Sequence, residues 1–130
     1  MSDGRLAGRV ALITGAARGQ GATEVEMFAA EGSFHGVICA GLFDYLKKPK
    51  AARLTASLYR ALRPGGVLYV GNMTPDLSNR WIMEHHLDWY LEYRTRQELM
   101  DFAREGAEGA NIELIEEQQG FNPFARIVRP

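Results

Sequence analysis

The stretch LRPGGVLYVGNMTP, residues 62–75, contains the strand around which the rest of the chain can be arranged. Arg-Pro-Gly-Gly is a strong turn signal, because proline fixes one backbone angle and glycine tolerates conformations that other residues avoid. The run from Val67 to about Gly71 is short, apolar and rich in β-branched residues, so it predicts a buried strand. Its lack of polar alternation is typical of strands that are covered on both faces.

Strands and helices alternate on the N-terminal side of this central strand. GRVALIT, residues 8–14, predicts a buried strand that ends at a glycine. A helical pattern runs from Gln20 to about Gly32, with an apolar stripe along one side. A second apolar strand is expected from Phe34 to Ala40, and a helix from Ala51 to Leu62.

Two helices and two strands are expected on the C-terminal side. One helix starts near Arg80, after a cap at Ser78 or Asn79, and another starts after Thr95, which forms a capping box with Glu98. NIELIEEQ (111–118) and FARIVR (124–129) predict a closing antiparallel pair. The chain is therefore expected to be one α/β domain, residues 1–130, with a Rossmann-like sheet of about five strands. That sheet is mainly parallel with an antiparallel C-terminal strand pair, and is either three-layered or half-covered.

The composition limits the classes of partner. A formal net charge of −1 argues against nucleic acid and anionic membranes as partners. The N-terminus lacks the apolar core of a signal peptide, and no apolar run approaches the length of a membrane helix, so a cytoplasmic location is expected. The single cysteine, Cys39, lies in an apolar run and is expected to be a buried structural thiol.

A glycine-rich loop, TGAARGQG (14–21), follows the first predicted strand. Glycines here permit a tight turn and close backbone approach, and the following helix N-terminus can hold a phosphate. Residues 4–33 resemble the start of short-chain dehydrogenases/reductases, which implies NAD(P). The residues assigned to this cofactor are Gly15, Arg18, Gly19, Gln20 and Gly21. The alternative for the same pattern is a tight strand-to-helix turn without a ligand.

The remaining signature of that dehydrogenase family is missing. No charged ribose-binding residue is present in HGVICA, residues 35–40. The catalytic Tyr-x-x-x-Lys is also missing, because Tyr45 is followed four residues later by Pro49 and Tyr59 by Arg63.

Residues 34–130 resemble a different family. FHGVICAGLFDYL, LRPGGVLYVGNMTP, MEHHLDWYLEYRT and GFNPFARIVRP are similar to the C-terminal half of class I S-adenosylmethionine-dependent methyltransferases, of the type that methylates 3-hydroxy fatty acids. The resemblance implies that Ala40, Gly41 and Leu42 face the cofactor. It places the substrate-side residues at Tyr45, Asn72, Tyr93 and Arg94, with Asp44, His85 and His86 nearby.

Individual side chains in this segment have competing interpretations. Arg94 could pair with a substrate carboxylate or form a structural ion pair. Helix packing is favoured for Trp81, Trp89 and Tyr90. Adjacent histidines point about 100° apart on a helix, so no metal site is expected at His85 and His86.

The two resemblances together describe a chimera in which a dehydrogenase-like segment (1–33) precedes a methyltransferase-like segment (34–130). Three functions follow: methyl transfer from S-adenosylmethionine to a small carboxylic acid with an incomplete pocket and little activity, an NAD(P)-dependent reductase, or a non-catalytic nucleotide-binding fold. A right-handed crossover predicts the strand order one, two, three, five, four along the chain, with all large helices on one face. The bare face or the edge of the first strand is then expected to form a homodimer.

Overall fold

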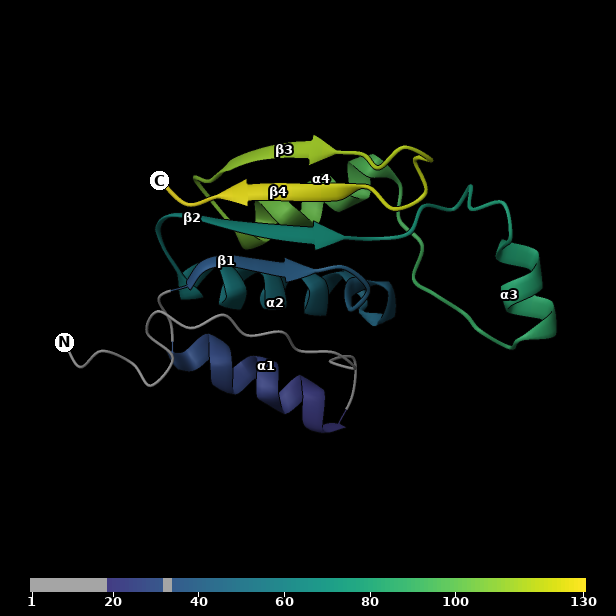
Figure 1. Cartoon of the computed structure of the whole chain (residues 1–130), viewed down its shortest axis with the longest axis horizontal. Coiled ribbons are helices and arrows are strands. Elements are labelled where there is room, and N and C mark those ends of the chain that lie inside the picture. Colours follow the sequence, from purple (N-terminus) through teal and green to yellow (C-terminus); the bar gives the residue numbers. More distant parts are fainter. Residues whose placement is uncertain (1–18, 32–33) are drawn as a thin grey trace.

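The computed structural model describes residues 19–31 and 34–130. Within these ranges four strands form one sheet in the order β1-β2-β4-β3 (Figure 1). Their bounds are Phe34–Cys39 for β1, Leu62–Gly71 for β2, Asn111–Ile115 for β3 and Phe124–Val128 for β4. β1 runs parallel to β2, whereas β4 is antiparallel to both β2 and β3.

The observed sheet confirms the α/β class, the antiparallel C-terminal pair and the order of the last four predicted strands. The described sheet contains one parallel and two antiparallel strand pairs. The first predicted strand (8–14), with Gly15 and Arg18, lies outside the described residues. Gly19, Gln20 and Gly21 form the first turn of the first described helix.

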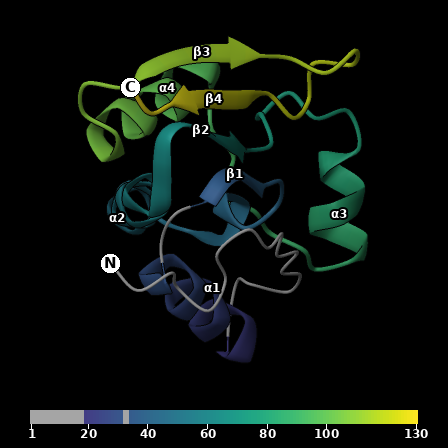
Figure 2. The ribbon, with the colours of Figure 1, turned by 60° about the vertical axis from the view of Figure 1, so that its left-hand side comes forward.

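Five helical segments accompany the sheet in the part of the chain that the structure describes. They are α1 Gly19–Glu31, the 3-10 turn η1 Phe43–Tyr45, α2 Lys48–Ala61, α3 Arg80–His86 and α4 Arg96–Gly106. α2 and α4 pack side by side on one face of the sheet (Figures 1 and 2), and α1 packs against α2. No helix within the described ranges covers the other face, so the described sheet is half-covered. None of these helices is long and apolar enough to cross a membrane.

Helix boundaries follow local chemistry. α2 begins three residues before the predicted start, because Pro49 fits the first turn, where its missing N–H is not needed. The predicted capping box of α4 is present, with Thr95 accepting from the Glu98 N–H and Glu98 accepting from the Thr95 N–H. Asn79 caps α3 without a side-chain hydrogen bond. α3 ends at His86, and Asp88 follows with a φ of 49°.

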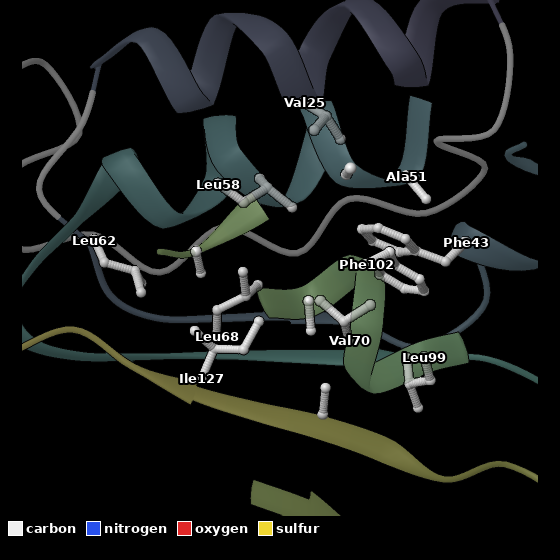
Figure 3. Close-up of a cluster of buried hydrophobic side chains, with 14 residues drawn as sticks. Val25, Phe43, Ala51, Leu58, Leu62, Leu68, Val70, Leu99, Phe102 and Ile127 are labelled. Carbon is white, nitrogen blue, oxygen red and sulfur yellow. The ribbon is translucent and has the colours of Figure 1, made fainter. Parts of the chain in front are cut away.

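The core lies between the sheet and the helices α2 and α4 (Figure 3). Alternate residues of β2 and β4 point into it, because successive side chains of a strand face opposite sides. Its fully buried members include Leu68, Val70, Leu99, Phe102, Ala125 and Ile127. Val25 extends this cluster to α1, which places the first helix with the later helices, as predicted.

The uncovered face is partly apolar and partly charged. Ile38 of β1 is 71% exposed on it. In the same cross-strand row lie Tyr69, Arg126 and Glu113. Arg126 Nη1 lies 2.8 Å from Glu113 Oε1, and its Nε donates to the Tyr69 hydroxyl at 3.3 Å. The β3–β4 half of this face therefore has its own polar network.

Gly106 sets the separation between α2 and α4. A Cβ atom at this position would lie 2.6 Å from Thr55 Cβ and 2.7 Å from the Ala52 carbonyl oxygen. Because one of these contacts is backbone, the helices would have to move apart to accept a methyl group. The two helices that cover the sheet therefore depend on a residue without a side chain at their contact.

We predict that Gly106→Ala lowers the free energy of unfolding by about 1–3 kcal/mol through overpacking. Urea denaturation followed by circular dichroism measures this change. Gly36→Ala is the matched control, because the added Cβ would meet only the Val67 carbonyl oxygen at 3.7 Å. Equal stability of the two variants would show that α2 and α4 do not require this close contact.

Candidate functional site

The carboxyl ends of β1 and β2 lie at the same edge of the sheet, since the two strands are parallel. In open α/β sheets, ligands bind outside the carboxyl ends of the strands. Ala40 and Gly41 follow β1 and are exposed, whereas Leu42 is partly buried against the core. A Cβ atom placed on Gly41 would meet no atom of the described residues within 4 Å. With respect to residues 19–31 and 34–130, the end of β1 is therefore open to an approaching ligand.

Arg94 is buried beneath this edge, with 6% of its surface exposed. Its Nη1 donates to the Phe43 carbonyl oxygen at 2.9 Å and to Asn72 Oδ1 at 2.6 Å, and its Nη2 donates to the Leu46 carbonyl oxygen. The guanidinium also lies 5.2 Å from the centre of the Phe102 ring. One cation therefore joins the segment after β1 to the residue that follows β2.

Asn72 is fully buried and continues the network. Its Nδ2 donates to the carbonyl oxygens of Glu92 at 2.9 Å and Met73 at 3.1 Å. The backbone N–H of Arg94 donates to the same Met73 carbonyl at 3.0 Å. These bonds hold the segment before α4 against the end of β2.

Asp44 is the third member of what we call the polar clamp, Asp44–Asn72–Arg94. Its Oδ1 accepts from the Met73 N–H at 2.7 Å, and its carbonyl oxygen accepts from the Glu92 N–H at 2.6 Å. Burial raises the pKa of the carboxyl to about 6, although the Met73 N–H and the charge of Arg94 act in the opposite direction. Asp44 thus contributes to the clamp at the cost of an unfavourable buried charge above pH 6.

The polar clamp distinguishes between the two roles considered for Arg94, a substrate-binding residue and a structural one. Both terminal nitrogens of its guanidinium donate to acceptors of the protein itself, and the side chain is buried. This geometry favours the structural alternative over pairing with a substrate carboxylate. Asn72 is likewise engaged on both atoms of its amide and fully buried.

The two candidate tyrosines lie in different surroundings. Tyr45 is 40% exposed, and its hydroxyl accepts from Trp89 Nε1 at 2.9 Å. The Arg80 guanidinium lies 4.3 Å from the centre of the Tyr93 ring, and the buried Tyr93 hydroxyl has no hydrogen-bond partner among the described residues. Burial, with the charge of Glu84, raises the pKa of Tyr93. Tyr45 is therefore the candidate residue that can reach a ligand.

The interpretation of Trp81, Trp89 and Tyr90 as helix-packing residues is wrong. α3 ends at His86, before two of them, and their side chains are 57%, 45% and 62% exposed. The sequence WIMEHHLDWYL (81–91) contains several aromatic residues but no clear apolar stripe, and this pattern could have indicated that their side chains are exposed. Sequence reasoning also missed the part that Asp44 plays in the clamp, because its contacts are distant in sequence.

Two further expectations can be compared with the structure. Cys39 is partly buried against the core, and burial raises the pKa of its thiol to about 11, as expected for a structural rather than a reactive cysteine. In residues 19–31 and 34–130, no group of three or more His, Cys, Asp or Glu side chains is placed to hold a metal ion, His85 and His86 included.

Solved structures with a similar fold include several methyltransferases. An O-methyltransferase family protein from Burkholderia thailandensis matches with a TM-score of 0.62 at 16% identity, over 80% of this chain and 32% of that one. An S-adenosylmethionine-dependent methyltransferase from Thermotoga maritima, a possible histamine N-methyltransferase, matches with a TM-score of 0.56 at 17% identity, over 76% of this chain and 57% of that one. The likeness is one of fold, between the described part of this chain and a part of each of these proteins.

A third structure was solved with S-adenosylhomocysteine bound. It is magnesium protoporphyrin IX methyltransferase from Synechocystis, with a TM-score of 0.53 at 10% identity, over 76% of this chain and 46% of that one. The chain thus spans from a third to somewhat over half of the length of these proteins. Comparisons with protein-family models and with curated proteins found no match.

We predict that Asp44→Asn removes a pH dependence of stability. The folded-state pKa of about 6 lies above the ordinary value, so wild-type stability falls as pH rises from about 4 to 6. The variant should gain about 2 kcal/mol relative to wild type between pH 4 and pH 7. Urea unfolding at each pH measures this. Asp76→Asn is the control of opposite sign, since hydrogen bonding to Thr74 lowers the pKa of Asp76 and its stabilisation is lost as pH falls. A flat difference between Asp44→Asn and wild type would contradict the prediction.

We predict that Arg94→Lys lowers the free energy of unfolding by about 2–4 kcal/mol, because an ammonium group cannot replace the forked donors to three buried acceptors. Thermal and urea denaturation measure the loss. Arg104→Lys is the control, since the Arg104 side chain is 59% exposed and lies 3.6 Å from Asp101. Unchanged stability together with weaker binding of a carboxylic acid would instead identify Arg94 as a substrate-binding residue.

Proposed function

We propose that the chain is a class I methyltransferase-like domain that binds S-adenosylmethionine at the carboxyl ends of β1 and β2. The observation that carries the proposal is the open end of β1 at Ala40 and Gly41, held in place by the polar clamp. The shared fold supports the choice of cofactor. Rigid elements around an open backbone segment suit ligand binding, because little further ordering is required.

The described residues fit part of this cofactor. The exposed backbone of Ala40 and Gly41 leaves room for the end of the molecule that carries the methyl group. The ribose, in contrast, lacks an obvious carboxylate, because Asp44 is 3% exposed and its carboxylate accepts from the Met73 N–H. We therefore expect weak affinity, with a Kd of roughly 0.1–1 mM, or about −4 to −5.5 kcal/mol.

The acceptor that we propose is a small carboxylic acid, on the basis of the sequence resemblance. A carboxylate is already ionised at neutral pH, so this acceptor needs no general base from the protein. The requirement is positioning of the carboxylate oxygen in line with the methyl group. Tyr45 is the candidate side chain that lies exposed near this edge. With half a pocket, positioning is incomplete, and we propose that turnover is slow or absent.

Two other functions remain as competitors. The NAD(P)-dependent reductase depends on residues 14–21, most of which lie outside the described residues, and the similar solved structures described above are methyltransferases. A non-catalytic nucleotide-binding fold differs from our proposal only in the absence of methyl transfer. The identity of the bound cofactor distinguishes our proposal from the reductase. An assay of methyl transfer distinguishes it from the non-catalytic fold.

Calorimetric titration with S-adenosylhomocysteine, and separately with NAD(H) and NADP(H), tests the proposed cofactor. We predict binding of S-adenosylhomocysteine at about 1 mM or below and no binding of the dinucleotides. Gly41→Gln should abolish this binding by filling the open end of β1, whereas Gly36→Gln, the same change at an exposed position earlier in β1, should leave it intact. Binding of a dinucleotide alone, or equal loss in both variants, would overturn the proposal.

A further inference from the structure

Exposed apolar side chains gather on one segment outside the polar clamp. We call this segment the aromatic arm, residues 80–90, which comprises α3 and the four residues after it. Five large apolar side chains of the arm are exposed: Trp81 57%, Ile82 41%, Leu87 61%, Trp89 45% and Tyr90 62%. Tyr45 adjoins them through its hydrogen bond to Trp89. α3 stands apart from the sheet and the other helices (Figures 1 and 2).

The arm is held in a defined shape. The Trp89 N–H donates to the Met83 carbonyl oxygen at 2.9 Å, and the Leu87 N–H to that of Ile82 at 3.3 Å. Met83 is buried, and Arg80 pairs with Glu84 at 2.8 Å along α3. An ordered apolar surface loses little conformational entropy on association, which favours its use as an interface.

The exposed area has the size that an interface needs. Aromatic side chains present roughly 150–250 Å² each, so the exposed fractions of the arm and Tyr45 amount to roughly 500–700 Å² of apolar surface. Because the arm is eleven consecutive residues and Tyr45 is hydrogen-bonded to one of them, this area lies at the upper end of what soluble monomers expose in their largest patch. It approaches the roughly 800 Å² that each partner contributes to a standard interface, with polar rim atoms still to be added.

We propose that the aromatic arm is the interface of a homodimer, in which it packs against the arm of a second copy of this chain. A two-fold axis requires only one self-complementary patch, and the arm supplies it. Its rim carries charges of both signs, with Arg80 beside Glu84 and Asp88 further along, so two copies do not meet with like charge only. This inference does not depend on the proposed cofactor.

The uncovered sheet face is the competing surface for the same dimer. Its central row contains the Arg126–Glu113 pair and the Tyr69 hydroxyl that Arg126 contacts. Burying this pair against a second sheet would cost desolvation energy that the pair's attraction does not fully return. Five of the eleven arm residues are exposed large apolar side chains, so the arm offers more apolar area for the charge that it would bury, and we assign the interface to the arm.

Both tryptophans of the chain, Trp81 and Trp89, lie in the arm, so their fluorescence reports directly on this interface. We expect light scattering to give twice the monomer mass at about 100 μM protein. Dilution should convert the dimer to monomer with a red shift of the tryptophan emission, as the indoles become exposed to water. A monomer at all concentrations, or a dimer whose emission does not change on dilution, would overturn the proposal.

Three charge-introducing variants locate the contact. Leu87→Glu in the arm should yield a monomer with red-shifted emission at every concentration. Ile38→Glu on the uncovered sheet face and Met27→Glu on α1 are matched controls, since their side chains are 71% and 57% exposed, and both should remain dimeric. Loss of the dimer in Ile38→Glu with its retention in Leu87→Glu would assign the interface to the sheet face. An emission shift on adding decanoate, with no change on dilution, would identify the arm as a ligand surface. Either result would overturn the proposal.

Discussion

The buried guanidinium of Arg94 is the contact on which the candidate site depends. Its acceptors belong to the Phe43 and Leu46 carbonyls after β1 and to the Asn72 side chain after β2. A cation out of water is stable only when these acceptors stay in place, so the segments cannot move independently. The stacked rings of Phe43 and Phe102, 5.5 Å apart, add an apolar seal between the same loop and α4.

This arrangement determines what is left for a ligand. The polar side chains nearest the strand ends already form hydrogen bonds within the protein. Arg94 donates to Asn72, and Asp44 and Asn72 bond to backbone groups. A ligand at this edge therefore meets the exposed backbone of Ala40–Gly41 and aromatic side chains such as Tyr45. Among the described residues, such a surface provides shape and rigidity but few free charges.

The sequence predicted the elements better than the site. The capping box at Thr95–Glu98 and the order of the last four strands were readable because they depend on local chemistry and chain connectivity. The clamp was not readable, since Arg94 contacts residues 22 to 51 positions away and no periodicity marks such pairs. The exposed positions of Trp89 and Tyr90 after α3 were missed for a related reason. The chain leaves the helix before Asp88, which has a positive φ, and no glycine or proline marks this turn in the sequence.

One face of the described sheet is left without a covering helix. This face is partly polar, because Tyr69, Arg126 and Glu113 make a row of polar contacts across three strands that water can solvate. In the aromatic arm, by contrast, Trp81, Leu87 and Trp89 are exposed within nine consecutive residues. Apolar surface without polar cover has the most to gain from a partner. The arm therefore has more to gain from association than the uncovered sheet face, although the sheet is the larger of the two elements.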